Sequence, residues 1–330
     1  MIKKLLLIFL LIYPQISYSN VEIDFNIWLN KFKIRALKKG ISEETINNSL
    51  KNAKYLKQVI KYDRHQPEFF EDTKTYVNKR ATRSRMIKAK ALLIKNQKLF
   101  DEVEKKFNVE KELLLALWGI ETNFGNHVGK MDIISSLATL SFDKRRSEFF
   151  SKELIVLLKL IDQKLVAVDT LYGSWAGAFG NFQFMPSAIE NYAIDYDKNG
   201  KIELKQSLHD AVASAANYIS KIGWKYQSSC FYKVKLTKPI PKKYINTSAK
   251  KIKNYMTIKS WKEKGIVDIE NINDKNNAAL VIPDLAVPEG NENSPAFLVF
   301  KNYEKILQWN RSLRFGVTIC TLANMIKNEI

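Results

Sequence analysis

The stretch LLLALWGIETNFG, residues 113–125, decides the fold of the chain around it. Its first half is apolar at every position, which is typical of a helix buried on all sides, and we predict one helix over 109–121. Leu113, Leu117 and Glu121 are four residues apart and therefore share one helix face. A single carboxylate thus follows an apolar run, and Gly125 after it allows another chain segment to approach closely.

A carboxyl group in such a setting has a distinct chemistry. Burial beside apolar side chains disfavours the charged form and raises the pKa of a carboxyl. A glutamic acid that stays protonated near neutral pH can donate its proton to a departing oxygen, so Glu121 is a candidate general acid. A lone glutamate at a helix end is more often solvated or salt-bridged, because charged residues are mostly surface residues. The helix pattern by itself leaves both roles open.

The composition is that of a folded chain with a large basic excess. Of its 330 residues 46% are hydrophobic, which is enough to bury one large core or several smaller ones. Lys and Arg number 53 against 34 Asp and Glu, and the net charge of +19 is spread along the chain. This balance indicates an anionic partner such as nucleic acid, an acidic membrane or an acidic polymer, and it is equally compatible with a solvated basic surface.

Residues 1–19 have the organisation of an export signal. Lys3 and Lys4 form the positive end, the apolar run 5–12 follows, and the triplet SYS at 17–19 offers small residues for cleavage. The apolar run is too short to span a bilayer, and no cysteine lies near the cleavage site to carry a lipid anchor. We therefore predict a soluble, exported protein without a transmembrane segment, which argues against a nucleic-acid partner.

The sequence after the signal begins with helices. Residues 20–105 are predicted to form an N-terminal helical domain. Gly40 ends its first helix, Ser42 begins the next, and a long charged helix is predicted over 80–105. Asn108 is the expected N-cap of the helix at 109–121.

Residues 106–228 form the predicted catalytic core, which continues with helices over 145–166, from Pro186 onward and over 208–222. Residues 229–295 carry prolines and short β-prone runs, which predicts a small inserted β subdomain. Residues 296–330 are predicted to return to the helical core. Cys230 and Cys320 could pair in an oxidising compartment or remain two buried thiols, and the sequence leaves both open.

Two motifs in order carry a family resemblance. WGIETNFG at 118–125, followed by GSWAGAFGNFQFMPS at 173–187, resembles the lytic murein transglycosylase B family, and further similarity runs through most of the mature chain. The resemblance implies a mainly α (α+β) fold with a lysozyme-like helical catalytic core. It also implies a periplasmic enzyme that cuts peptidoglycan glycan strands, in a setting where cell-wall synthesis or division proteins are the expected further partners.

The resemblance also assigns roles to single residues. Glu121 is the implied catalytic acid and base, and Ser174 takes the place of a serine that orients the N-acetyl group of the bound sugar. Trp309 and Phe315 stand where some relatives carry tyrosines, so substrate contacts are expected to differ there. The implied substrate-binding positions are Ser174, Gln183, Tyr218, Asn310 and Trp309. Among the aromatic residues of 173–187, about half or more are expected to pack in the core.

One carboxylate implies a particular reaction. Ordinary glycosidases use two carboxylates, and neither Asp132 nor Asp143 has a setting that recommends it as a partner for Glu121. A one-carboxylate site suits a different reaction, and the family resemblance implies a transglycosylation that needs no cofactor and leaves a 1,6-anhydromuramoyl end. A hydrolytic muramidase and a catalytically inactive wall-binding protein remain the alternatives.

The loop DYDKNGKIEL, 195–204, resembles the start of an EF-hand. Oxygen ligands at its first, third and fifth positions and a glycine at the sixth suit Ca²⁺, but the twelfth position is Gln206 rather than glutamate. A variant loop closed by a later acid is the prediction, and a plain Asx turn without metal is the alternative. The predicted ligands are Asp195, Asp197, Asn199, the backbone carbonyl of Lys201, and Asp210.

Overall fold

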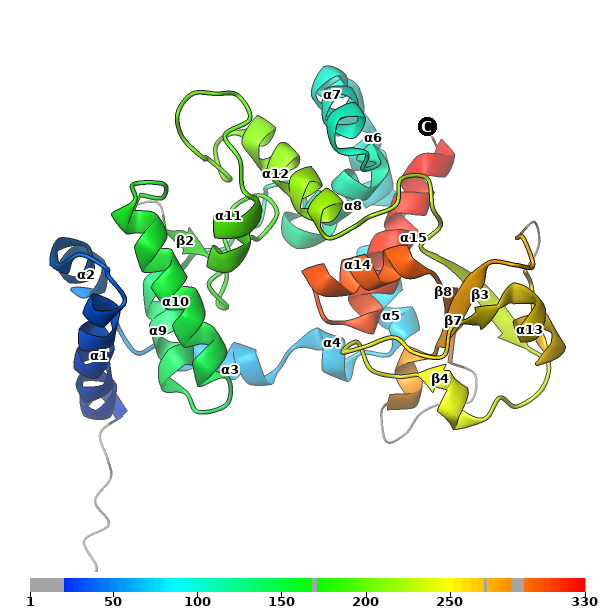
Figure 1. Cartoon of the computed structure of the whole chain (residues 1–330), viewed down its shortest axis with the longest axis horizontal. Helices are drawn as coiled ribbons and strands as arrows, with labels where there is room; N and C mark the ends of the chain where they lie inside the picture. Colours follow the sequence, from blue (N-terminus) through cyan, green and yellow to red (C-terminus); the bar gives the residue numbers. More distant parts are fainter. Residues whose placement is uncertain (1–20, 168–170, 270–271, 287–293, 330) are drawn as a thin grey trace, which may run out of the picture.

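The computed structural model describes residues 21–167, 171–269, 272–286 and 294–329. The predicted export signal lies outside these residues. Within them the chain is mostly helical, with a small sheet at one end of the molecule and a separate two-stranded pair among the helices (Figure 1). None of the described helices combines the length and the apolar character that crossing a membrane requires. The predicted mainly α fold with a small β part is confirmed.

The N-terminal helices begin and end largely where the sequence signals place them. Gly40, with φ of +82°, follows the end of α1, and the Ser42 hydroxyl accepts a hydrogen bond of 3.2 Å from the Thr45 amide as the N-cap of α2. The first seven helices are α1 (Val21–Lys38), α2 (Glu43–Leu50), α3 (Lys57–Arg64), α4 (Pro67–Phe70), α5 (Thr73–Arg80), α6 (Arg83–Lys95) and α7 (Gln97–Phe107).

Two expectations for this region are wrong. The helix predicted over 80–105 is broken into α6 and α7 at Asn96, whose side-chain amide donates a hydrogen bond of 2.9 Å to the Leu92 carbonyl. Asn108 does not cap the next helix. It ends α7 in the left-handed conformation, with φ of 52°, and Glu110 is the N-cap residue of α8 (Lys111–Thr122). Asparagine tolerates this conformation better than most residues, which explains the change of role.

Helix α8 lies at the centre of the helical part, between α6, α7, α12 and α15. The five residues from Leu113 to Leu117 are buried, so apolar neighbours surround the helix as its sequence requires. The other helices of this part are α9 (Ile133–Phe142), α10 (Ser147–Asp162), α11 (Pro186–Tyr192), α12 (Leu208–Lys221), α14 (Lys301–Trp309) and α15 (Leu313–Glu329). A two-stranded antiparallel pair, β1 (Met131–Asp132) with β2 (Tyr172–Gly173), joins the turn after α8 to the glycine-rich segment.

The sheet is built around β3, β7 and β8, in the strand order β4-β7-β8-β3-β6, and β5 also pairs with β7. All its pairs are antiparallel except the parallel pair of β4 with β7. It reaches Val299, four residues beyond the predicted end of the β subdomain at 295. Its elements are β3 (Phe231–Leu236), β4 (Ile245–Asn246), β5 (Met256–Thr257), α13 (Ile258–Glu263), β6 (Ile266–Val267), β7 (Asn277–Val281) and β8 (Ala296–Val299).

Two links hold the sheet to the helical part, and both end on α15. Cys230, just before β3, forms a disulfide with Cys320, which resolves the two alternatives left by the sequence in favour of pairing. Asp284, in the short 3-10 helix after β7, accepts hydrogen bonds from Arg314 at 2.9 Å and from the Thr73 amide at 3.0 Å. The β part is therefore fixed to α5 and α15 by covalent and polar contacts as well as by apolar packing.

Candidate active site

Glu121 is the penultimate residue of α8 and lies where the apolar core meets polar side chains. Leu117 and Leu113, one and two helical turns before it on the same face, are 0% and 3% exposed, whereas Glu121 is half-buried. Its Oε1 atom accepts a hydrogen bond of 2.8 Å from the indole nitrogen of Trp309, the last residue of α14. This hydrogen bond therefore joins α14 to α8, and the two residues that form it are 188 positions apart in the sequence.

Asn181 connects the end of α8 to the glycine-rich segment. Its side-chain oxygen accepts from the Trp118 indole at 3.0 Å, and its backbone carbonyl accepts from the Thr122 hydroxyl at 2.7 Å. Gly125 has φ of +80°, and a Cβ atom there would lie 2.7 Å from the Asn181 side-chain oxygen. The close approach expected at Gly125 is therefore present. Asn181 is 7% exposed, and it is a site residue that was not predicted from the sequence.

Ser174 and Gln183, both half-buried, belong to the same loop structure. The Ser174 hydroxyl accepts from the amides of Ala176 and Ala178, at 3.3 and 3.0 Å. The Gln183 amide group donates to the carbonyls of Val128 and Gly180, at 3.2 and 2.9 Å, and so ties the turn after α8 to the loop. Both residues therefore shape the wall in which they stand, in addition to any contact with a ligand.

Four aromatic rings meet beside Glu121. Trp309 stacks on Tyr218 of α12, with ring centroids 4.9 Å apart, and Tyr218 stacks on Tyr192 of α11 at 4.2 Å. Phe184 packs edge-on against Trp309 at 5.5 Å. Burial raises the pKa of Tyr218 to about 12, with smaller contributions from Tyr192 and Glu153, so its phenol stays neutral through the physiological range.

The structure brings most predicted site residues into one connected region. Glu121, Trp309 and Tyr218 are joined by direct contacts, Gln183 precedes Phe184 of the ring cluster, and Asn310 follows Trp309 as a half-buried residue. Three of the four aromatic residues expected to divide between core and surface, Phe179, Phe182 and Phe184, are buried, in line with the expectation that half or more are core. Phe315 is also buried, at 3% exposure.

The two acids considered as partners of Glu121 have other roles. Asp132 is the N-cap of α9, where one carboxylate oxygen accepts from the Ser135 amide at 3.1 Å and the other accepts from its hydroxyl. Asp143 forms an ion pair of 2.9 Å with Arg64. These contacts use Asp132 as a helix cap and Asp143 in an ion pair, the two roles that the sequence analysis gave as alternatives to catalysis.

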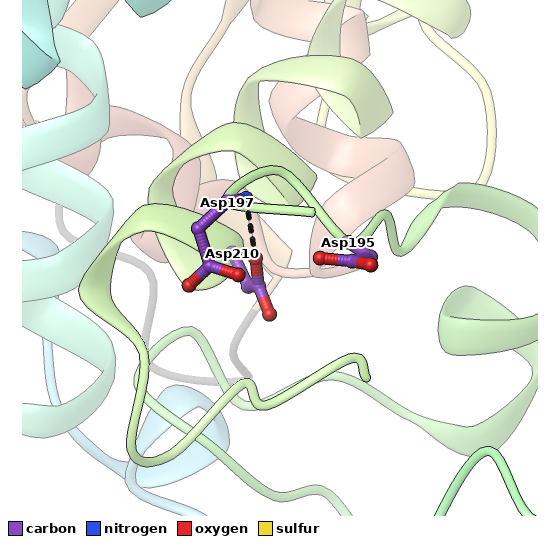
Figure 2. Close-up of side chains that lie close together, drawn as sticks. All are labelled: Asp195, Asp197 and Asp210. Carbon is purple, nitrogen blue, oxygen red and sulfur yellow. Dashed lines mark hydrogen bonds between the residues drawn. The ribbon is translucent and has the colours of Figure 1, made fainter. Parts of the chain in front are cut away.

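The acidic loop after α11 gathers three carboxylates (Figure 2). Asp195, Asp197 and Asp210 each offer an oxygen, and these three oxygens lie within 4.8 Å of one another. Asp210 comes from the first turn of α12 and is fully buried. Among the described residues this is the one cluster of at least three acidic, histidine or cysteine side chains with such spacing.

Backbone amides organise the same loop. Asp210 accepts from the amides of Tyr196 at 2.8 Å and Glu203 at 2.9 Å, so the carboxylate closes the loop onto α12. The Asn199 side-chain oxygen accepts from the Lys201 amide at 2.9 Å, and Asp195 accepts from the Gly200 amide at 2.8 Å. Carboxylate and amide oxygens converge in this loop, and Ca²⁺ prefers such hard ligands. The same hydrogen bonds are also those of Asx turns, so the loop fits the metal-free alternative as well.

Comparisons with known proteins agree with this architecture. The curated membrane-bound lytic murein transglycosylase B of Escherichia coli K12 is 41% identical over 119 residues, which are 36% of this chain and 33% of the relative. The match thus spans about a third of that relative's length. SltB3 from Pseudomonas aeruginosa, solved in complex with NAG-NAM-pentapeptide, superposes with a TM-score of 0.80 at 29% identity, covering 92% of this chain and 79% of SltB3.

A second solved structure shows the same fold at lower identity. The Escherichia coli lytic transglycosylase Slt35, solved in complex with calcium, superposes with a TM-score of 0.76 at 24% identity, covering 95% of each chain. These likenesses confirm the lysozyme-like helical fold expected from the sequence motifs. The family model described as the transglycosylase SLT domain matches residues 24–324, which include Glu121, the glycine-rich segment and Trp309, and the chain therefore belongs to the transglycosylase SLT domain family.

Proposed function

We propose that this protein is a peptidoglycan lytic transglycosylase with Glu121 as its single acid and base. The observation that carries the proposal is the placement of Glu121, which lies at the end of a buried helix with its carboxylate held by Trp309. Family membership and the likeness to SltB3, which was solved with NAG-NAM-pentapeptide and with NAG-anhNAM-pentapeptide, support the substrate class.

The proposed reaction cleaves the β-1,4 bond between N-acetylmuramic acid and N-acetylglucosamine. Glu121 donates its proton to the glycosidic oxygen, and the acetamido oxygen of the muramic acid stabilises the positive charge that develops at C1. The resulting carboxylate then accepts the proton of the C6 hydroxyl, whose oxygen bonds to C1 and closes the 1,6-anhydro ring. The nucleophile is part of the substrate, which removes much of the entropic barrier, and no water is consumed.

The other residues of the site would bind the glycan strand. Ser174, Gln183, Tyr218 and Asn310 offer neutral groups suited to hydroxyls and amides, and Trp309 adds an aromatic surface. The net charge of +19 suits a polymer whose stem peptides carry free carboxylates. We infer export to the periplasm from the N-terminal sequence, and cell-wall synthesis or division proteins are the further partners that this setting suggests.

Product analysis tests the proposal. Purified sacculi are digested with the wild type and with Glu121→Gln, which keeps the shape of the side chain and removes the titrating proton, and soluble products are identified by mass. We expect anhydro-muropeptides from the wild type and at least a thousandfold lower rate from the variant. Reducing ends would identify a hydrolytic muramidase instead. Binding of sacculi without any product would identify an inactive wall-binding protein, and unchanged release by the variant would remove Glu121 from its role.

We also propose that the loop 195–210 holds a structural Ca²⁺, while the reaction itself needs no cofactor. Asp195, Asp197, Asp210, the Asn199 side chain and the Lys201 carbonyl are the ligands that the loop offers. Calcium would link the loop to the start of α12, which carries Tyr218 further along. Weak binding is expected, since no bidentate glutamate occupies the twelfth position.

Calorimetry and thermal unfolding test this site. The wild type should release or absorb heat on calcium addition and gain thermal stability, and Asp195→Asn should lose both effects because it removes one charged ligand. A wild type that shows neither heat nor stabilisation at millimolar calcium would identify the loop as an Asx turn.

A further inference from the structure

The hydrogen bond between Trp309 and Glu121 bears on which carboxyl oxygen of Glu121 carries the transferred proton. We propose that Trp309 is a positioning residue: its indole N–H keeps Oε1 of Glu121 as an acceptor, so that Oε2 carries the proton used in the reaction. The same N–H would stabilise the carboxylate that forms when the proton leaves. This inference rests on the proposed function, and it concerns a position where the sequence analysis expected only a change in substrate contacts.

The indole and the carboxyl differ in which hydrogen bonds they can make. An indole nitrogen donates one hydrogen bond and cannot accept one, whereas a tyrosine hydroxyl at the same place could do either. In a protonated carboxyl the carbonyl oxygen is the better acceptor, so a donor 2.8 Å from Oε1 selects the form with its hydrogen on Oε2. Tryptophan therefore fixes which oxygen acts as the acid, and a tyrosine in its place would leave that choice to other contacts.

The indole is held firmly enough to impose this choice. Tyr218 stacks on it at an interplanar angle of 24°, and Tyr192 continues the stack at 5°. Phe184 packs at 77° to the indole and belongs to the glycine-rich segment. The Tyr218 hydroxyl also donates a bond of 3.3 Å to the carbonyl of Gln308, the residue before Trp309. Since Tyr218 covers one face of the indole, a sugar could contact only the other face.

The same bond favours one charge state of Glu121. A hydrogen bond donated to a carboxylate stabilises its charged form relative to its neutral form. The titratable groups that the described contacts bring to the rings and to the end of α8 include Tyr192, Tyr218 and Glu153. They also include Lys88, whose ammonium group donates to the Asn123 carbonyl at 3.3 Å, and His127, whose backbone amide donates to the Thr122 carbonyl at 2.9 Å. None of these residues is changed when Trp309 alone is replaced, so variants at position 309 are compared against a constant set of neighbouring charges.

The test is the pH dependence of three variants. Trp309→Phe keeps a ring and removes the donor, so the alkaline limb of kcat/KM should move up by about one pH unit, and kcat at the optimum should fall about tenfold or more. Trp309→Tyr returns a donor and should recover part of the shift. Trp224→Phe is the matched control, because the Trp224 indole donates to Glu110 at 2.6 Å near the start of α8, about 16 Å along the helix from Glu121. It should leave the alkaline limb unchanged.

A second measurement does not depend on turnover. Carbon-13 carboxyl resonances of the free protein are titrated by NMR, with Glu121→Gln used to identify the Glu121 signal. We expect the midpoint of this signal about one pH unit higher in Trp309→Phe than in the wild type. A folded Trp309→Phe protein with an unshifted midpoint and an unshifted alkaline limb would overturn the inference, even if its KM rises as expected for loss of a sugar contact. A wild type without anhydro products would instead contradict the proposed function, and the NMR comparison would still decide the role of Trp309.

Discussion

Removal of the disulfide between Cys230 and Cys320 should lower the stability of the whole protein. The bond closes a loop of 90 residues that contains the sheet. A loop of this length loses about 15 cal/mol/K of unfolded-state entropy on cross-linking, which is worth about 4.6 kcal/mol at 25 °C. The entropy of unfolding of a chain of this size is about 0.7 kcal/mol/K near its midpoint, so the expected fall in Tm is about 6–7 °C.

The assay compares thermal unfolding of the oxidised wild type, the wild type with a phosphine reductant, and the double variant Cys230→Ser with Cys320→Ser. The last two should unfold at the same lower temperature, and the reductant should have no further effect on the double variant. Thiol titration in denaturant should find no free thiol in the oxidised wild type and two after reduction. Two free thiols in the untreated wild type, or equal Tm values with and without reductant, would refute the reasoning.

Two further predictions concern the close approach of Gly129 to Gly173 and the buried ion pair of Asp284 with Arg314. Gly129→Ala should cost about 2 kcal/mol or more and strongly reduce activity, because a Cβ there would lie 2.1 Å from the Gly173 carbonyl oxygen and φ is +86°. Gly40→Ala, at φ of +82° with nothing within 4 Å, is its control and should cost about 1 kcal/mol without loss of activity. Asp284→Asn should cost about 3 kcal/mol in denaturant unfolding, because it removes the negative charge that lies 2.9 Å from the buried Arg314 guanidinium.

Local signals in the sequence located many helices but misjudged how some of them end. Gly40, Ser42 and Pro186 mark the boundaries that they predict, because each acts through its own backbone conformation or its own side chain. Asn96 and Asn108 stand in charged runs that would also suit an uninterrupted helix. Whether such an asparagine breaks, ends or begins a helix depends on which carbonyls and amides the tertiary structure leaves unpaired, and a single sequence does not contain that information.

In the candidate site, too, local features could be predicted from the sequence and contacts between distant segments could not. Glu121 and the glycine-rich segment could be identified from short motifs, since the residues that shape each are close together in the chain. The Trp309 contact could not, because it joins residues 188 positions apart and depends on how α14 and α8 both pack against α15. Asn181 was missed for a related reason. Its partners Trp118 and Thr122 are about 60 residues away, and nothing in the local pattern distinguishes it from a loop residue.

Helix α15 places Trp309 relative to Glu121, because both α14 and α8 pack against it. This helix begins at Leu313, four residues after Trp309, and packs along α8. Its residues Arg314 and Cys320 carry the two links to the sheet, so the β part holds the helix that sets the distance between the indole and Glu121. Loss of the disulfide should therefore weaken catalysis at temperatures below the unfolding transition, through a less fixed Trp309, and not only lower the Tm. A reduced enzyme with wild-type kcat just below its own transition would show that packing between α15 and α8 alone is enough to place the indole.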